Sequence, residues 1–430
     1  MPGLGRLVLA VCLIAGAGIA APAAQGDLRA EGRERIRLAV ERLCPIAELT
    51  GRRAVAAFPG SSLRAERHRP NVTAPRRTLI RLALPGARAM EIERWQSGQH
   101  LRRFTVSYHA AGPDGDVPVL FAIADGDCRI RQGRAIRAEG PAWRHLDLLD
   151  SDLTTIGGSE TLQAPWPDGR DPGGVRVALV DSGLAYDLPL FRDGLARDAD
   201  GTPLGYDFWD MDPWPYDGDT ARGPFLPMRH GTAVASILVR EAPNVALIPF
   251  RYPRPDMTRM ADIVDAAARA GARILVLPLG SRNADDWETF ARALSRRDML
   301  AIVSAGNDGR DIDRDPVYPA ALDLDTVLTV TSSDTEGRLA RGSNWGRVAV
   351  DIMLPGESIA VVDHLGRTGQ ASGSSFAVPR VAAMAARLLE AEPQLSARET
   401  KRRILDRAKR VPSADDAPVA TGWIADPLSR

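Results

Sequence analysis

The sequence of 430 residues has no net charge, few histidines and few cysteines. Lys and Arg together number 55, as do Asp and Glu, so the total charge does not indicate a nucleic acid or a membrane surface as a partner. After residue 24 no segment is long and apolar enough to span a bilayer. The length is sufficient for a large hydrophobic core, and it predicts about two or three folding units.

Residues 1–24 are typical of a secretory signal peptide. Arg6 supplies the positive start, Leu7–Ile19 the apolar stretch, and Ala21-Pro22-Ala23 a cleavage site with small residues. A transmembrane anchor is the alternative, but the apolar stretch is short and leads directly into the cleavage-like site. We therefore expect an exported protein, located in the periplasm or outside the cell.

The three cysteines agree with export. Cys12 is removed with the signal peptide, which leaves Cys44 and Cys128 in the mature chain. In an oxidising compartment these two residues have one intramolecular pairing available, and we expect a disulfide between them. Two unpaired buried thiols are the alternative. Neither residue has a neighbouring His, so the pair does not indicate a zinc site.

Charge is distributed unevenly between the two halves of the chain. Residues 28–150 contain 22 Arg and Lys against 14 Asp and Glu, a balance of +8. Residues 171–430 contain 31 Arg and Lys against 37 Asp and Glu, a balance of −6. Opposite charges favour association, so this asymmetry suits an intramolecular complex. A drift in composition between two independent domains explains it equally well.

The first half predicts a small α+β domain. Residues 31–49 have the apolar spacing of an amphipathic helix, and the Pro- and Arg-rich passage 58–77 indicates a loop. Residues 151–174 contain clusters of Gly and Pro and indicate a linker. The strands of a mainly antiparallel sheet are expected at Thr78–Leu84, Leu101–His109, Val117–Ala124 and Cys128–Ile136.

After Gly174, short apolar runs alternate with helical patterns, which predicts a parallel sheet with right-handed crossovers. Ligands in such sheets bind beyond the carboxyl ends of the strands, and Asp181 and Asn307 each lie just past the end of a predicted strand. The expected strands are Val175–Val180, Val245–Phe250, Ala272–Leu277, Ala301–Ser304 and Thr326–Thr331, and the expected helices are Gly231–Glu241, Met257–Ala270 and Trp287–Arg296.

Asp181, His230 and Ser375 are candidates for a nucleophilic site. A serine hydroxyl needs a base to take its proton and a partner that holds this base in the right tautomer. Ser375 lies at the start of a predicted apolar helix, Phe376–Leu389, with Pro379 tolerated in its first turn. His230 lies directly before a predicted helix, and Asp181 ends an apolar strand, where a carboxylate needs compensation. Taken singly, each residue has a structural interpretation: a helix cap, a structural histidine and a turn-forming aspartate.

Asn307 is the candidate donor to a developing negative charge. It follows Ala305-Gly306 at a strand end, where a side-chain amide is able to donate to the oxyanion of a tetrahedral intermediate. Its structural interpretation is a turn residue before Asp308-Gly309.

The chain order Asp, His, Ser and the motifs around these residues resemble the subtilisin-like serine peptidases, or subtilases. The similarity extends almost continuously from Val175 to Val381. It implies that Asp181, His230 and Ser375 form the catalytic triad and that Asn307 is the oxyanion donor. It also implies a three-layer sandwich around a mainly parallel sheet and no required cofactor. The motifs are Val-Ala-Leu-Val-Asp181-Ser-Gly, Arg-His230-Gly-Thr-Ala-Val-Ala-Ser, Ser-Ala-Gly-Asn307-Asp-Gly and Ser-Gly-Ser-Ser375-Phe-Ala-Val-Pro.

The segment Leu277–Ser281 resembles the substrate-binding strand of the same family, whose backbone pairs with the bound peptide. Leu279 and Gly280 are therefore the residues expected to bind substrate. Tyr318-Pro319 and residues 351–356 also resemble segments of the family.

Five positions depart from the pattern of the family. Ala233 stands where a His is usual and Ser236 where a Gly is usual, while Ser374 replaces a Thr, Arg380 a His and Ala383 a Gly. None of these changes removes an atom of the triad. They indicate a divergent branch of the family and leave the side-chain specificity open.

Aspartates are concentrated between Asp181 and His230. Many relatives bind structural calcium, and oxygen-rich loops suit that ion. However, these aspartates fit no twelve-residue loop pattern, which favours a solvated acidic loop over a calcium site. They are Asp187, Asp193, Asp198, Asp200, Asp207, Asp210, Asp212, Asp217 and Asp219.

These observations predict a signal peptide at 1–24, an α+β pro-region or accessory domain at 25–160 and a subtilisin-like peptidase domain at 161–430. The expected activity is that of a secreted serine endopeptidase that forms an acyl-enzyme. Its partners would be a protein or peptide substrate and its own N-terminal region, which would act as an intramolecular inhibitor.

Two other functions compete with this one. The first is a catalytically inactive, peptide-binding protein of the same fold, which the intact Asp181, His230, Asn307 and Ser375 disfavour. The second is an esterase of the α/β-hydrolase type, whose motif requires Gly where Ala377 stands and whose triad has the order Ser, Asp, His.

Overall fold

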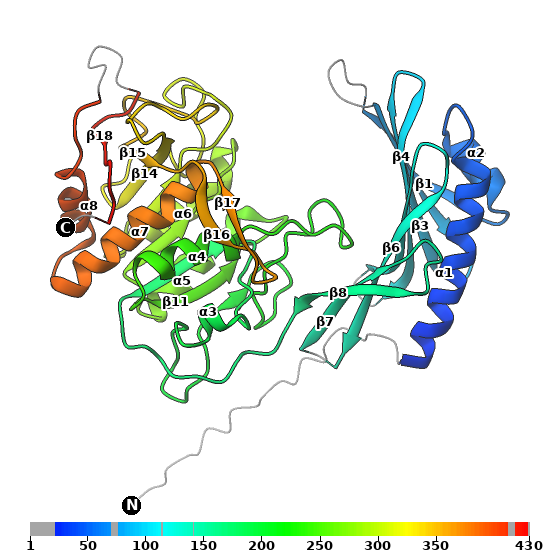
Figure 1. The fold of residues 1–430 in the computed structure, drawn as a ribbon, viewed down its shortest axis with the longest axis horizontal. Helices are drawn as coiled ribbons and strands as arrows, with labels where there is room; N and C mark the ends of the chain where they lie inside the picture. Colours follow the sequence, from blue (N-terminus) through cyan, green and yellow to red (C-terminus); the bar gives the residue numbers. More distant parts are fainter. Residues whose placement is uncertain (1–21, 70–75, 113–114, 141, 412–417, 429–430) are drawn as a thin grey trace, which may run out of the picture. The chain divides into compact units, whose positions relative to one another are not determined.

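The computed structural model describes residues 22–69, 76–112, 115–140, 142–411 and 418–428, with side chains described from residue 28 onward. The chain divides into two compact units, Met1–Thr161 and Leu162–Arg430, which are described separately (Figure 1). Nearly all of the predicted signal peptide, residues 1–21, lies outside the described residues. Within the described ranges, no helix combines the length and the apolarity needed to cross a bilayer.

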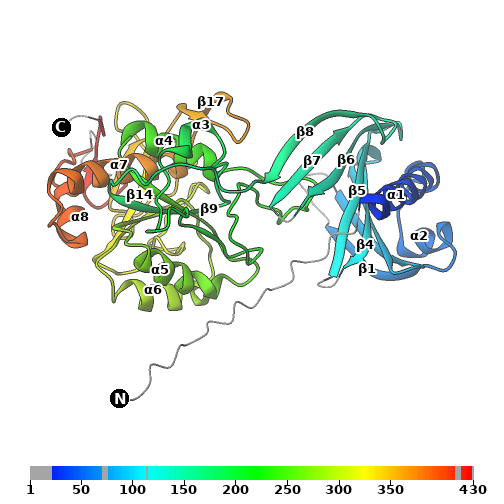
Figure 2. The same ribbon diagram turned by 90° about the horizontal axis from the view of Figure 1, so that it is seen from below.

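The N-terminal unit consists of two helices and one sheet of eight strands that follow one another in chain order. Each neighbouring pair from β1 to β7 is antiparallel. The helix α1 lies along one face of this sheet (Figures 1 and 2). The elements are α1 (Pro22–Leu43), α2 (Gly51–Ala57), β1 (Ser62–Arg69), β2 (Arg76–Leu84), β3 (Arg88–Ser97), β4 (His100–Gly112), β5 (Gly115–Ala124), β6 (Ile130–Glu139), β7 (Trp143–Leu149) and β8 (Ile156–Gln163).

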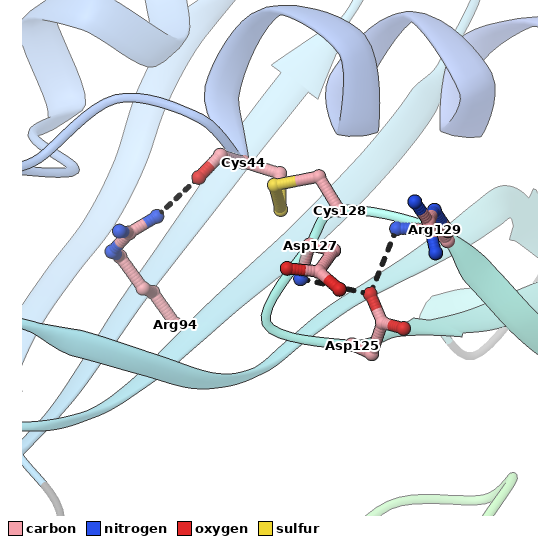
Figure 3. Close-up of a disulfide and its surroundings, with 6 residues drawn as sticks. All are labelled: Cys44, Arg94, Asp125, Asp127, Cys128 and Arg129. Carbon is pink, nitrogen blue, oxygen red and sulfur yellow. Dashed lines mark hydrogen bonds between the residues drawn. A yellow bond between two sulfur atoms is a disulfide. The ribbon is translucent and has the colours of Figure 1, made fainter.

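A disulfide between Cys44 and Cys128 ties the end of α1 to the turn between β5 and β6 (Figure 3). The backbone around both cysteines is held by further hydrogen bonds. Arg94 donates to the carbonyl oxygen of Cys44 at 2.6 Å. In the turn, Asp125 accepts the backbone N–H groups of Asp127 and Arg129 at 2.9 and 3.0 Å. The C-terminal end of α1 is therefore covalently tied to the turn between β5 and β6.

Three expectations for this unit are wrong. The predicted helix 31–49 ends at Leu43, and a second short helix follows after Pro45. The predicted loop 58–77 contains β1, an edge strand exposed along most of its length, which has no alternating apolar pattern. The predicted linker 151–174 contains β8.

The C-terminal unit is built on a second sheet, in the order β10-β11-β9-β12-β13-β14-β15-β18, with every neighbouring pair parallel. Its central strands are apolar and buried on both faces, as parallel strands between helices require. The strands are β9 (Arg176–Asp181), β10 (Tyr206–Asp207), β11 (Ala246–Arg251), β12 (Ile274–Leu277), β13 (Leu300–Ser304), β14 (Val327–Ser333), β15 (Ile352–Pro355) and β18 (Gly422–Trp423), with a separate hairpin of β16 (Ile359–Val362) and β17 (Thr368–Ala371).

Helices cover both faces of this sheet. One hydrophobic cluster joins residues of α4, α7 and α8 to one face, and a second joins residues of α5 and α6 to the other (Figure 2). The three-layer α/β sandwich around a parallel sheet is thereby confirmed. The helices are α3 (Pro189–Arg192), α4 (Gly231–Glu241), α5 (Met260–Arg269), α6 (Glu288–Leu294), α7 (Ser374–Ala391) and α8 (Ala397–Leu405), with 3-10 turns η1 (Met257–Arg259) and η2 (Ala284–Trp287).

The start of α7 differs from the prediction in a way that matters for the site. The helix begins at Ser374 rather than Phe376, so Pro379 lies inside the helix and not in its first turn. Because proline has no N–H, the carbonyl of Ser375, four residues earlier, receives no helical hydrogen bond from it.

The segment after β8 belongs to the C-terminal unit and is not a free linker. Ala164 is fully buried in the core, and its carbonyl accepts the hydroxyl of Tyr186. The indole of Trp166 stacks on the ring of Tyr186 with centroids 4.2 Å apart. Asp171 forms an ion pair with Arg176 at 3.1 Å. The chain therefore packs as part of the C-terminal unit from Ala164 onward.

Candidate active site

Asp181 and His230 meet at the carboxyl end of the parallel sheet. Asp181 is the last residue of β9, and His230 is the N-cap of α4. The Nδ1 atom of His230 lies 2.9 and 2.8 Å from the two carboxylate oxygens of Asp181. Gly231 permits this approach, because a Cβ atom there would lie 2.0 Å from the carbonyl oxygen of Gly183. The helix can therefore begin directly against the strand end.

The imidazole of His230 is in an environment that favours its protonated form. Burial acts to lower the pKa of His230, but the charge and the hydrogen bond of Asp181 outweigh it, and Asp217 adds to them, so the pKa is raised. Asp181 itself is nearly buried, with 5% of its side chain exposed, whereas 34% of the His230 side chain is exposed. The imidazole is thus held on its Nδ1 side and remains partly exposed to solvent.

Ser375 is the second residue of α7, directly after Ser374. Gly373, the N-cap residue, has a φ of 129°, a conformation that L side chains rarely adopt. The Ser375 hydroxyl donates to the carbonyl oxygen of Pro278 at 3.2 Å. The next residue, Phe376, places its ring 5.5 Å from that of His230, centroid to centroid. The helix start therefore lies beside the imidazole, with the serine hydroxyl held by the segment after β12.

Asn307 lies beyond the end of β13 and is fixed by the start of α7. Its Oδ1 atom accepts both the backbone N–H and the hydroxyl of Ser374, each at 2.9 Å. A backbone N–H only donates, so the oxygen of the amide, and not its nitrogen, must face Ser374. The NH2 group therefore points away from Ser374. Asn307 also borders the cavity described next.

A cavity of about 230 Å³ lies between the segment after β12 and the segment after β13. Ser375 and Asn307 both border it, as do Leu279 and Gly280, the residues expected to bind substrate. Gly280 packs tightly against the chain behind it, since a Cβ atom there would lie 2.6 Å from the carbonyl oxygen of Tyr318. The remaining lining residues are Pro278, Ser281, Arg282, Ser304, Gly306, Asp308 and Val317.

Two residues next to the predicted triad went unrecognised in the sequence. Ser182 and Asp217 are both buried and form a hydrogen-bonded network with the first residues of α4. Asp217 is one of nine aspartates in the stretch between Asp181 and His230, and nothing in its local sequence distinguishes it from the others.

The interpretation of this stretch as a solvated acidic loop is wrong for three of its aspartates. Asp207, Asp217 and Asp219 are buried, with 2%, 0% and 7% of their surface exposed. Donors of the chain itself satisfy them: Asp207 accepts from Arg251 at 2.8 Å, and Asp219 accepts the hydroxyl of Tyr252 at 2.6 Å.

The oxygens of Asp207, Asp217 and Asp219 already accept hydrogen bonds from the chain. Within the described ranges, no group of three or more His, Cys, Asp or Glu side chains is arranged to hold a metal ion.

Three of the departures from the family pattern make specific contacts. The hydroxyl oxygen of Ser236 accepts the backbone N–H of Val362 at 3.0 Å. This hydrogen bond attaches the hairpin β16–β17 to α4. Arg380 forms a buried ion pair with Glu241 at 2.9 Å and so joins α7 to the end of α4. Ser374 orients Asn307, as described above. Arg380 and Ser374 thus connect elements that carry site residues, while Ser236 connects α4 to the hairpin that precedes α7.

Comparison with known proteins identifies similar sequences over the C-terminal unit. The model of the peptidase family described as the subtilase family matches residues 173–422. The thermophilic serine proteinase of Bacillus sp. (strain AK1) is 30% identical over 239 residues, covering 52% of this chain and 54% of that protein. Thermitase of Thermoactinomyces vulgaris is 27% identical over 245 residues, covering 53% of this chain and 80% of thermitase.

The halolysin-like extracellular serine protease Nep of Natrialba magadii is 27% identical, with 47% of its length covered. The chain thus spans about half the length of this relative and of the thermophilic proteinase. Among solved structures, a cold-adapted subtilisin-like serine proteinase matches with a TM-score of 0.48 and 21% identity, over 61% of this chain and 91% of that one.

Proposed function

The chain belongs to the subtilase family, and from this premise we propose that it is a serine endopeptidase that hydrolyses peptide bonds through an acyl-enzyme. The observation that carries the proposal is the hydrogen bond between His230 and Asp181, next to a helix start that brings Ser375 and Asn307 to one cavity. This arrangement supports the roles of His230 as base, Asp181 as orienting carboxylate, Ser375 as nucleophile and Asn307 as oxyanion donor.

In the first half-reaction, the Ser375 hydroxyl turns from the Pro278 carbonyl toward Nε2 of His230. His230 takes the hydroxyl proton while the oxygen attacks the carbonyl carbon of the substrate. Asp181 accepts the Nδ1–H of His230, which keeps Nε2 free as the base and stabilises the imidazolium that forms. The negative charge of the tetrahedral intermediate is stabilised by the NH2 of Asn307 and the backbone N–H of Ser375.

The second half-reaction returns the enzyme to its starting state. His230 gives its proton to the leaving amine, the peptide bond breaks, and the acyl group stays on Ser375. Water then loses a proton to His230, attacks the acyl carbon and releases the carboxylic acid product, while Ser375 regains its proton. Each step uses only side chains and amides of the chain itself.

A peptide substrate would bind along the segment Pro278–Ser281. Leu279 and Gly280 border the cavity, so a peptide that pairs with their backbone would place its scissile carbonyl near Ser375. The side chain before the scissile bond would enter the cavity.

We further propose that the protein is exported and that its N-terminal unit acts as an intramolecular inhibitor. The opposite charge balances of residues 28–150 and 171–430 support an association between the two parts. The packing of Ala164 and Trp166 limits where the chain can be cut to release this unit. Mass spectrometry of secreted protein should find the new N-terminus at or before Ala164, whereas an intact N-terminal unit in the active protein would show that removal is not required.

A fluorophosphonate probe tests the activity directly. We expect it to label Ser375 of the secreted protein, with labelling lost in Ser375→Ala and strongly slowed in His230→Ala. Hydrolysis of casein in the same preparation tests for endopeptidase activity. A folded, processed protein that neither reacts with the probe nor cleaves casein would overturn the proposal in favour of a peptide-binding protein.

A further inference from the structure

Asp217 is a fully buried carboxylate directly behind the catalytic histidine. It belongs to the loop between β10 and α4, well separated in sequence from Asp181. Its Oδ1 atom accepts the hydroxyl of Ser182 at 2.6 Å and the backbone N–H of His230 at 3.3 Å. Its Oδ2 atom accepts the backbone N–H of Thr232 at 3.0 Å. Both oxygens of Asp217 thus face donors.

Ser182 completes the network from the other side. Its hydroxyl oxygen accepts the backbone N–H groups of His230 and Gly231 at 3.0 and 2.9 Å. The first N–H groups of a helix have no partner within the helix, and buried donors without a partner are costly. Ser182 and Asp217 together satisfy three of them at the start of α4. Because Ser182 directly follows Asp181, the same network links the strand end to the helix start.

We propose that Asp217 is a positioning residue of the active site: with Ser182 it holds the start of α4, and therefore His230, against the end of β9 that carries Asp181. The inference rests on the proposed function, because it assigns a further residue to the same reaction. Asp217 touches neither the substrate nor the reacting atoms and acts entirely through His230.

The electrostatics of His230 agree with this role. The charged groups that act on its imidazole are Asp181, at the end of β9, and Asp217, in the loop before α4, and both raise its pKa against the effect of burial. From α7, Phe376 contributes an uncharged ring. His230 must be neutral to act as a base, so the rate should rise with pH through its pKa. Removal of the Asp217 charge lowers this pKa and moves the rise to lower pH.

The variant Asp217→Asn preserves the shape of the side chain but leaves only one acceptor oxygen. Either the N–H of Thr232 or the donors of Ser182 and His230 must then face an NH2 group. A misplacement of a catalytic group by about 1 Å costs up to about 10²-fold in rate, so we expect kcat to fall by about 10- to 100-fold. KM should change little, and the acid limb of the kcat/KM profile should shift to lower pH.

Two further variants separate position, charge and folding. Ser182→Ala removes the acceptor for two N–H groups but keeps the Asp217 charge, so kcat should fall without a shift of the acid limb toward lower pH. Asp219→Asn is the matched control, since Asp219 is buried in the same loop but accepts from Tyr252 and Ala221. Its kcat and its acid limb should equal those of the parent. Ser182→Ala also serves as the test of position should Asp217→Asn fail to fold.

An NMR titration of the His230 imidazole keeps this test independent of the peptidase activity. It is made in the Ser375→Ala background, with the His230 signal assigned from a His230→Gln variant. We expect a lower pKa of His230 with Asp217→Asn and an unchanged one with Asp219→Asn. The inference is overturned if Asp217→Asn gives the parent titration curve in this background and the parent kcat with Ser375 intact. Failure of the parent protein to react with the fluorophosphonate would instead contradict the proposed function and leave the titration as the test of Asp217.

Discussion

The variant Asn307→Asp isolates the proposed oxyanion donor. In the structure, Oδ1 of Asn307 accepts two hydrogen bonds from Ser374, each at 2.9 Å, and Asn307 borders the cavity. An aspartate has nearly the same shape and keeps an oxygen toward Ser374. It replaces the NH2 donor with a second oxygen that carries negative charge. The change therefore removes the donation while it preserves the anchoring contact.

The expected loss in kcat follows from the number of hydrogen-bond donors to the oxyanion. Loss of one of two oxyanion donors lowers kcat by about 10²–10³, which corresponds to about 3–4 kcal/mol of transition-state stabilisation. Repulsion between the new carboxylate and the oxyanion adds to this, so we expect kcat to fall by at least about 10³. KM should stay close to that of the parent, because the donor binds charge that develops only in the transition state.

Steady-state kinetics with a chromogenic peptide amide measure both constants, and thermal unfolding confirms that the variant is folded. Ser374→Ala is the companion, because it removes one of the two contacts that orient the amide and leaves the NH2 in place. We expect its kcat to fall by about tenfold. A kcat for Asn307→Asp within about tenfold of the parent, or an effect confined to KM, would refute the oxyanion role.

Three further predictions concern stability and specificity. Arg380→Met leaves the buried carboxylate of Glu241 with only the more distant Arg240, at 3.9 Å, as an ion-pair partner, so we expect a loss of about 3 kcal/mol in the free energy of unfolding in denaturant titrations. The Arg380→Met, Glu241→Gln double variant should recover most of this lost stability. If the single and double variants lost the same free energy of unfolding, the ion pair between Arg380 and Glu241 would not be the cause. The disulfide spans a sequence separation of 84 residues, so Cys44→Ser should lower the stability of the N-terminal unit by about 4 kcal/mol. Limited proteolysis of Cys44→Ser should then degrade the N-terminal unit first. If the N-terminal unit resisted the protease as well as in the parent protein, the disulfide would not have the expected stabilising effect. Asp308 borders the cavity, so substrates with Lys before the scissile bond should be favoured over those with Glu, and Asp308→Asn should reduce this preference by about fivefold in kcat/KM. A preference that Asp308→Asn leaves unchanged would exclude this role.

The sequence predicts the C-terminal unit well because its signals are local. Apolar runs suited to buried parallel strands alternate with helical patterns, and the helix Gly231–Glu241 has the predicted bounds. The N-terminal unit is harder to predict. Its edge strand β1 carries charged residues along an exposed surface, so no alternation of apolar residues marks it. Strand β8 lies in a passage rich in Gly, which has the composition of a linker.

The geometry around the site is less accessible to sequence analysis because it depends on long-range contacts. Asp181 and His230 could be proposed from their places at a strand end and a helix start. Asp217 could not, since its role depends on where a long loop returns to the start of α4. The contact between Ser375 and the carbonyl of Pro278 likewise joins residues 97 positions apart in the chain.

Two of the departures from the family pattern, Arg380 and Ser236, are explained by their partners. Arg380 replaces a His on α7, and its guanidinium reaches both Glu241, at the end of α4, and the carbonyl oxygen of Pro355. An imidazole is shorter than a guanidinium and is not permanently charged, so it would leave Glu241, 4% of whose side chain is exposed, with only the more distant Arg240 at 3.9 Å as a permanent cation. Ser236 similarly binds a backbone N–H of the hairpin that leads to α7. Restoring the usual His at position 380 would therefore remove a contact between the two helices that carry His230 and Ser375, and restoring the usual Gly at position 236 would remove the contact between α4 and the hairpin.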